Sequence, residues 1–128
     1  MEYLVAERNL WIDDVDRKEY RAIQKIPFPE WNFKYAVWGV GTQPAHDFCK
    51  LMKKYMPNGR LIAGIDIVDG GNDCGCHIIK PKDIYEIPED VIIIITDPFV
   101  QESAKRILME LERPFVLLKG AEVECYNF

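Results

Sequence analysis

The chain has 128 residues and a formal net charge of −5 at pH 7, and 48% of its residues are hydrophobic. This length and composition are typical of one globular domain with a single core. The acidic balance argues against binding to nucleic acids, which present a phosphate backbone that requires a basic protein face.

Neither the apolar runs nor the first residues indicate a membrane or export segment. The longest uninterrupted apolar run is Val91–Ile95, far shorter than the roughly 20 residues of a membrane-spanning helix. The N-terminus is acidic and lacks the basic start of a signal peptide. Four cysteines in such a chain favour free thiols in a reducing compartment. We therefore expect a cytoplasmic protein with no membrane partner.

Residues 1–34 are predicted to form an arm that packs on the rest of the domain. A short strand or an extended arm suits Leu4, Val5 and Leu10–Ile12, and a helix suits Arg17–Lys25. Pro27 and Pro29 end that helix, because each lacks an N–H and restrains the residue before it.

A strand, a glycine turn and a helix are predicted between residues 35 and 56. Tyr35–Trp38 forms a buried strand, Gly39 and Gly41 form the turn, and the helix begins near Pro44. Apolar residues at helical spacing predict its buried face: Ala45, Phe48, Cys49, Met52 and Met56. A helix that begins in this way directs main-chain N–H groups and the positive end of its dipole at whatever lies there.

Four further apolar stretches predict the remaining strands: Leu61–Val68, His77–Ile79, Val91–Thr96 and Pro114–Leu118. Strands that are apolar on both faces are expected in a parallel sheet covered by helices on both sides. Alternating strands and helices over residues 35–119 predict a single α/β domain with a parallel, doubly wound sheet. Right-handed crossovers give it about five strands in an order like 3-2-1-4-5. Residues 120–128 are predicted to be a C-terminal tail.

A second helix is predicted to begin at Asp97-Pro98, because Asp is a favoured N-cap and Pro suits the first helical position. It is expected to run through Leu111. Its inward face is predicted to consist of Ala104, Ile107, Leu108 and Leu111.

The order of these motifs resembles a small Rossmann-type domain. VWGVGT at residues 37–42 is followed by GID at residues 64–66 and by EDVIIIITDP at residues 89–98. The pattern is similar to NAD(P)- or nucleotide-sugar-binding fragments of sugar epimerases and dehydratases, and to the C-terminal domain of some sugar C-methyltransferases. The resemblance covers roughly residues 35–119. It implies a nucleotide or nucleotide-sugar ligand, with NAD as the candidate cofactor.

The chain departs from those families at two points. Pro44 stands where the fingerprint G-x-G-x-x-G has its third glycine, which weakens the case for a standard dinucleotide fit. The sequence also contains no Tyr-x-x-x-Lys pair that could serve as catalytic acid and base. The resemblance therefore implies a binding domain and leaves open whether the protein is an enzyme.

Gly39, Gly41, Thr42 and Gln43 are predicted to contact the phosphate groups of this ligand through main-chain N–H groups. The alternative is a tight β–α turn that binds nothing.

Four acidic or polar residues lie at the ends of the two strands that flank the first strand in the predicted order. Asp66 is placed to accept hydrogen bonds from ribose hydroxyls, which favours NAD over NADP, and Asp69 is close enough to serve instead. Thr96 and Asp97 end the strand beside the point where the strand order reverses, which is where ligands bind in such sheets. The alternative for Asp97 is that it only caps its helix.

The cluster Asp73-Cys74-Gly75-Cys76-His77 suggests metal or thiol chemistry. Zinc sites usually pair two C-x₂₋₄-C groups, and redox pairs usually have the spacing C-x-x-C. A loop with incidental thiols is therefore favoured, and no metal site is predicted.

A different class of function is a degenerate Rossmann fold that binds no ligand and serves as an interaction module. Exposed aromatic residues are typical interface anchors and would allow a homodimer. The candidates for this surface are Trp11, Phe28, Trp31, Tyr126 and Phe128.

Overall fold

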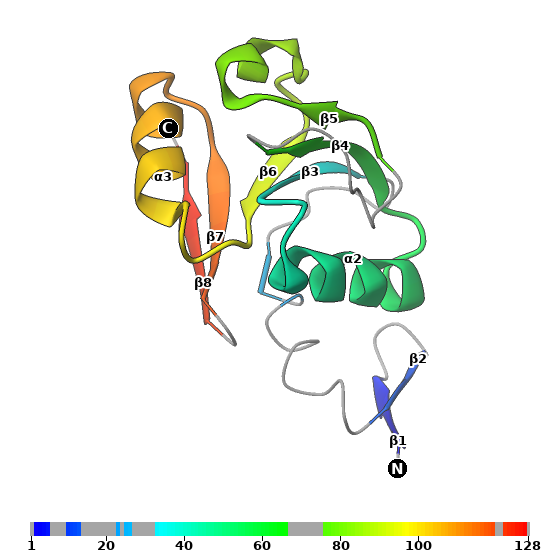
Figure 1. Ribbon diagram of the computed structural model, residues 1–128. Coiled ribbons are helices and arrows are strands. Elements are labelled where there is room, and N and C mark those ends of the chain that lie inside the picture. Colours follow the sequence, from blue (N-terminus) through cyan, green and yellow to red (C-terminus); the bar gives the residue numbers. More distant parts are fainter. Residues whose placement is uncertain are drawn as a thin grey trace.

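The computed structural model describes residues 2–5, 10–13, 23, 25–26, 33–66, 76–119 and 122–127. Strands β1 (Glu2–Val5) and β2 (Leu10–Asp13) form a separate two-stranded antiparallel sheet near the N-terminus (Figure 1). Most of the predicted helix Arg17–Lys25 lies outside the described residues. Ile23 and Ile26 are buried in the domain core, so this part of the predicted arm packs on the domain.

The main sheet has six strands in the order β5-β4-β3-β6-β7-β8. Counted along the chain from β3, this is the order 3-2-1-4-5-6. The first five strands are parallel, which confirms the mostly parallel α/β sheet predicted from the sequence. The strands are β3 (Lys34–Trp38), β4 (Arg60–Ile65), β5 (Ile78–Ile79), β6 (Ile92–Ile95), β7 (Phe115–Lys119) and β8 (Glu122–Tyr126).

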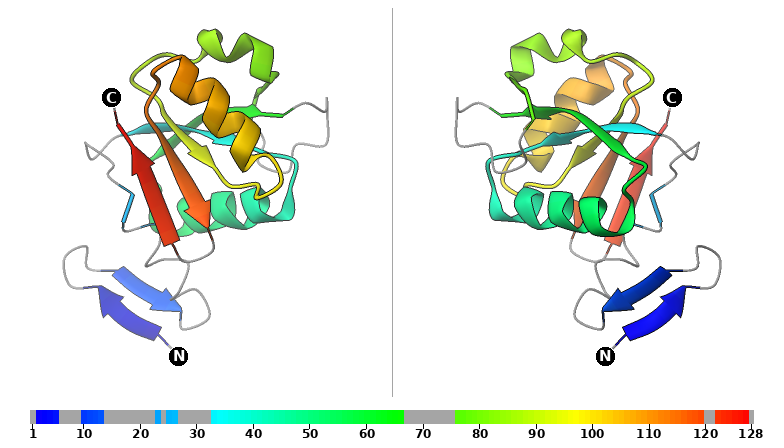
Figure 2. Two further views of the ribbon diagram at one scale, coloured as in Figure 1. Left: turned by 90° about the vertical axis from the view of Figure 1, so that its left-hand side faces the viewer. Right: turned by 90° about the vertical axis from the view of Figure 1, so that its right-hand side faces the viewer.

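Helices cover both faces of this sheet (Figures 1 and 2). Helix α2 (Gln43–Tyr55) packs on one face, and the 3₁₀ helix η2 (Pro81–Glu86) and helix α3 (Gln101–Glu110) pack on the other. Side chains alternate between these two cores along β3, so that Val37 faces α2 and Trp38 faces the opposite side. The apolar face predicted for α2 is confirmed, because all five of its residues are buried.

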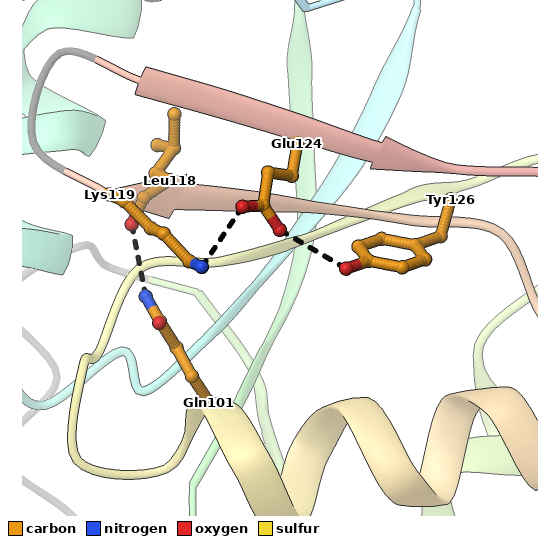
Figure 3. Close-up of polar contacts among 5 residues, drawn as sticks. All are labelled: Gln101, Leu118, Lys119, Glu124 and Tyr126. Atoms are coloured by element: carbon orange, nitrogen blue, oxygen red, sulfur yellow. Dashed lines mark hydrogen bonds and ion pairs between the residues drawn. The ribbon is translucent and has the colours of Figure 1, made fainter.

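Strand β8 was predicted to be part of a tail, but it forms an edge strand antiparallel to β7. Its Tyr126 ring stacks on Phe115 with the ring centroids 4.6 Å apart, and the Tyr126 hydroxyl donates to Glu124 Oε2 at 3.1 Å (Figure 3). Lys119 Nζ lies 3.0 Å from Glu124 Oε1 across the two strands. Gln101 of α3 donates to the Leu118 carbonyl at 3.1 Å. The ring stacking and the Lys119–Glu124 ion pair attach β8 to β7, and the Gln101 bond attaches β7 to α3.

The predicted start of α3 was wrong by three residues. Asp97 Oδ1 accepts a hydrogen bond from Phe99 N at 2.9 Å, and Asp97 O accepts one from Val100 N at 3.3 Å. The second bond spans three residues rather than four, so the chain first makes a tight turn. The α-helix itself begins at Gln101.

The end of α3 also differs from the prediction, because Leu111 is 55% exposed rather than inward-facing. The helix ends at Glu110, and Glu112 adopts a left-handed conformation with φ of 52°. Glu112 N donates to Met109 O and Arg113 N donates to Leu108 O, the two bonds of a Schellman motif. This motif turns the chain before Leu111 can reach the core.

Candidate functional site

The structure brings the predicted site residues together at the carboxyl ends of β3, β4 and β6. Strand β3 lies between the other two, so the turn at residues 39–42 has Asp66 on one side and Asp97 on the other. The chain leaves β3 toward α2 on one face of the sheet and leaves β6 toward α3 on the opposite face. In open α/β sheets, such a point of divergence forms a crevice where ligands bind.

Gly39 begins the turn, and its position requires glycine for two reasons. Its φ is 89°, a conformation that L-residues with a side chain rarely adopt. A Cβ added to Gly39 would lie 2.4 Å from the Cβ of Asp97. Its N–H donates to Ile65 O at 2.7 Å, which ties the turn to the end of β4. The turn is therefore held tightly between β4 and β6.

Thr42 is the N-cap of α2, and it bonds to main-chain N–H groups in the first turn of the helix. Its hydroxyl donates to Gly39 O at 2.7 Å and accepts a bond from Ala45 N at 3.4 Å. Its carbonyl accepts from His46 N at 3.0 Å, and Pro44 has no N–H to offer. Within the described part of the chain, the main-chain N–H of Gln43 has no hydrogen-bond acceptor. The helix start thus retains Gln43 N–H for a ligand.

Asp66 contacts the glycine turn directly, which the sequence analysis did not anticipate. The main-chain N–H of Gly41 donates to Asp66 Oδ2 at 3.0 Å. Gly41 N was predicted to meet a phosphate and Asp66 a ribose, but here they bind each other. Spacing in the sequence carries no signal for this contact, because the two residues are 25 positions apart on neighbouring strands. Asp69, the alternative to Asp66, lies outside the described residues.

Thr96 and Asp97 end β6 and are both buried. The Thr96 hydroxyl donates to Trp38 O at 3.2 Å, so this side chain connects two strands. Asp97 is 7% exposed, and its Oδ1 accepts a bond from Phe99 N. Of the two residues, Asp97 has a second carboxylate oxygen that accepts no hydrogen bond from the residues that the structure describes.

Phe99 is a residue that the sequence analysis missed. It lies two residues beyond Asp97 and is 95% exposed. The sequence signal is an aromatic side chain directly after Asp97-Pro98, at the carboxyl end of a central strand. Its ring could stack on a planar ligand group.

The Cys74–His77 cluster contributes no metal centre within the described ranges. Cys76 is half-buried against the core under α2, His77 is exposed, and Asp73 and Cys74 lie outside the described residues. Among the residues that are described, no three His, Cys, Asp or Glu side chains come close enough to hold a metal ion.

A small cavity of about 100 Å³ lies at the opposite, amino end of β6 and β7. Val91, Phe115 and Cys125 are among its lining residues, and burial raises the pKa of the Cys125 thiol. This cavity does not include any of the predicted site residues.

Two further findings complete the description. In the described ranges, no helix combines the length and apolar character needed to cross a membrane. A scan against protein-family models, a search of curated proteins and a search of solved structures each find no match to this chain.

Proposed function

We propose that this chain is a Rossmann-like domain that binds a nucleotide or nucleotide-sugar, with NAD among the candidates, at the carboxyl edge of its sheet. The carrying observation is the glycine turn between β3 and α2, which lies between Asp66 and Asp97 on the two neighbouring strands. The strand order and the helices on both faces support a doubly wound fold of this kind.

Each group at this edge has a role in the proposal. Asp66 is a hydrogen-bond acceptor for ribose hydroxyls, and Gln43 N–H and the dipole of α2 favour a polar or anionic ligand group. Phe99 offers an exposed ring for stacking on a base. Among the described residues at this edge we identify no acid and base pair, so we assign no catalytic residue and propose binding as the role.

Thermal unfolding in the presence of candidate ligands tests the proposal. The panel is NAD, NADP, ATP, S-adenosylmethionine and several nucleotide-sugars. A ligand at 100 times its dissociation constant stabilises the folded state by about 2.7 kcal/mol, enough to raise the Tm of a domain this size by several degrees. A shift with at least one compound is expected. No shift across the panel would contradict the proposal.

A substitution in the turn then locates the site. Gly41 is exposed, and a Cβ there would lie 3.0 Å from Asp66 Oδ2, so Gly41→Leu places a bulky group over the edge without entering the core. We expect this variant to remain folded and to lose the ligand-induced Tm shift. Lys53→Leu, at an exposed position on α2, is the matched control and should retain it. An unchanged shift in Gly41→Leu would place the ligand elsewhere.

The alternative function is a ligand-free interaction module that self-associates. Tyr85 and Phe99 favour it, because they are 77% and 95% exposed and exposed aromatic residues are typical interface anchors. Tyr126 supports it less, since its ring stacks on Phe115. Light scattering over a range of concentrations separates the two functions: a stable dimer that Phe99→Ala dissociates supports this alternative, and a monomer at all concentrations rejects it.

A further inference from the structure

Two carboxylates flank the glycine turn at the carboxyl edge. Asp66 Oδ2 accepts a hydrogen bond from Gly41 N at 3.0 Å. On the other side, the carboxyl carbon of Asp97 lies 3.4 Å from the position that a Cβ on Gly39 would occupy. The absence of a side chain on Gly39 therefore allows Asp97 to lie directly against the turn.

The Asp97 carboxylate has an unused acceptor in a buried position. The side chain is 93% buried, and its Oδ1 is bonded to Phe99 N at 2.9 Å. Its second oxygen receives no hydrogen bond from any residue that the structure describes. Buried carboxylates normally have several donors, because removing an unsatisfied charge from water is costly. A ligand that supplies a donor would satisfy this atom.

A phosphate group suits this environment poorly. The turn and the ends of β3, β4 and β6, at residues 39–43, 66 and 96–100, contain no lysine or arginine. A phosphate over the turn would meet Asp66 and Asp97, and like charges a few ångströms apart repel each other. The Gly41 N–H is already bonded to Asp66, so the Gln43 N–H and the positive end of the α2 dipole are left to oppose this repulsion.

We propose that Asp66 and Asp97 together receive the hydroxyl groups of a ribonucleoside, so that the sugar rather than a phosphate lies over the turn. Ionised carboxylates only accept hydrogen bonds, and the two hydroxyls of ribose are donors that match two acceptors. The inference rests on the proposed function and specifies its ligand class: the ribose is required, and a phosphate is dispensable.

Titration calorimetry with three matched sets of compounds tests the inference on the intact chain. The sets are the four common ribonucleosides, their 5′-monophosphates, and their 2′,3′-dideoxynucleosides. For the base that binds best, the ribonucleoside and monophosphate should have similar affinities, within roughly threefold. The dideoxynucleoside should bind at least about tenfold more weakly, because hydrogen bonds to charged groups are lost.

A pair of isosteric substitutions assigns the effect to Asp97. Asp97→Asn keeps an oxygen for Phe99 N but replaces the unused acceptor by an amide donor. It should weaken ribonucleoside binding roughly tenfold and leave dideoxynucleoside binding nearly unchanged. Asp90→Asn is the control, since Asp90 is an exposed carboxylate at the amino end of β6, and it should change neither. Thermal unfolding verifies that both variants are folded. If Asp97→Asn does not fold, Asp66→Asn is measured in its place.

Other binding results would contradict the inference alone or both proposals. A monophosphate that binds at least about tenfold more tightly than its ribonucleoside, or a dideoxynucleoside that binds equally well, overturns this inference while the proposed nucleotide site stands. If none of these compounds binds and the NAD and nucleotide-sugar panel also gives no shift, both proposals fail.

Discussion

The two ends of the parallel strands bury charged side chains in opposite ways. At the amino end, Arg113 is 9% exposed, and its guanidinium donates to Ile87 O at 2.7 Å and to Pro88 O. Burial lowers the pKa of Arg113, and the nearby Glu89 and Asp90 carboxylates oppose this effect. At the carboxyl end, Asp97 is equally buried but receives one main-chain bond from Phe99.

The difference indicates that one end stabilises the fold and the other is available for a ligand. Arg113 connects the turn after α3 to the segment before β6, because Nη1 and Nη2 each donate to one of the chain's own carbonyls. Asp97 holds its turn with one oxygen, and none of the described residues donates to the other. Four substitutions follow in order of decreasing expected effect; the first two test this division, and the last two test contacts that hold the helix end and the edge strand.

Gly39→Ala should give the largest loss of stability. The added Cβ would clash with Asp97, and a φ of 89° is strained for alanine, so we expect a loss on the order of 3 kcal/mol. Urea unfolding measures it. Gly41→Ala, in the same turn but without positive φ, should lose less than about 1 kcal/mol. Equal losses in the two variants would mean that the turn is not held against Asp97.

Arg113→Met should destabilise the domain by about 2 kcal/mol, because it leaves the Ile87 and Pro88 carbonyls without their donors while the apolar stem is retained. Ligand affinity at the carboxyl edge should not change. Urea unfolding and the ligand-induced Tm shift are measured on the same preparation. A variant that keeps its stability but loses ligand binding would reverse the roles of the two ends.

Glu112→Gly should stabilise the protein by roughly 0.5–1 kcal/mol. Glu112 lies at the left-handed position that ends α3, with φ of 52°, where glycine has no steric penalty. Glu110→Gly, inside the last turn of the helix, is the control and should destabilise by a similar amount. Thermal unfolding distinguishes the two. A destabilised Glu112→Gly variant would contradict the cap assignment.

Glu124→Gln should have the smallest effect, and the effect should depend on pH. Hydrogen bonds from Lys119 and then Tyr126 hold the pKa of Glu124 below its ordinary value of 4.5. The contribution to stability is therefore present above pH 4.5 and is lost as the pH falls through the lowered pKa. Because these groups are exposed, the difference should be small. Urea unfolding between pH 3 and 7 tests this prediction. The free energies of unfolding of the variant and the wild type should become equal at the acid end. A difference in stability that stays constant with pH would exclude ionisation of the Glu124 carboxylate as the source of that difference.

Patterns within single segments predicted the secondary structure where the local signals agreed. The apolar spacing of α2 and the β-branched run of β6 were read correctly, because both elements bury the residues that their periodicity selects. The start of α3 was misplaced, since Asp97-Pro98 is a good helix start that a tight turn can use equally well. Strand β8 was missed although its polar and apolar residues alternate, because it is only five residues long and forms by pairing with β7.

In the candidate site too, some features could be predicted from the sequence and others could not. From the sequence, Gly39, Asp66 and Asp97 could each be placed at a strand end, because parallel strands bring their carboxyl ends to one edge. The position of Phe99 after Asp97-Pro98 was visible in the sequence, but its exposure and the Gly41–Asp66 hydrogen bond were not, since neither is a property of one segment.

The sequence by itself determined that this is an α/β chain with mostly parallel strands and a glycine turn before its first main helix, because periodicity, turn residues and capping act over a few neighbouring positions. Only the tertiary structure decided which groups meet. It placed Asp97 against Gly39 and paired Asp66 with Gly41, because strand register and sheet order set the distances between residues far apart in the chain. Those distances determine which polar atoms the fold uses itself and which remain for a ligand.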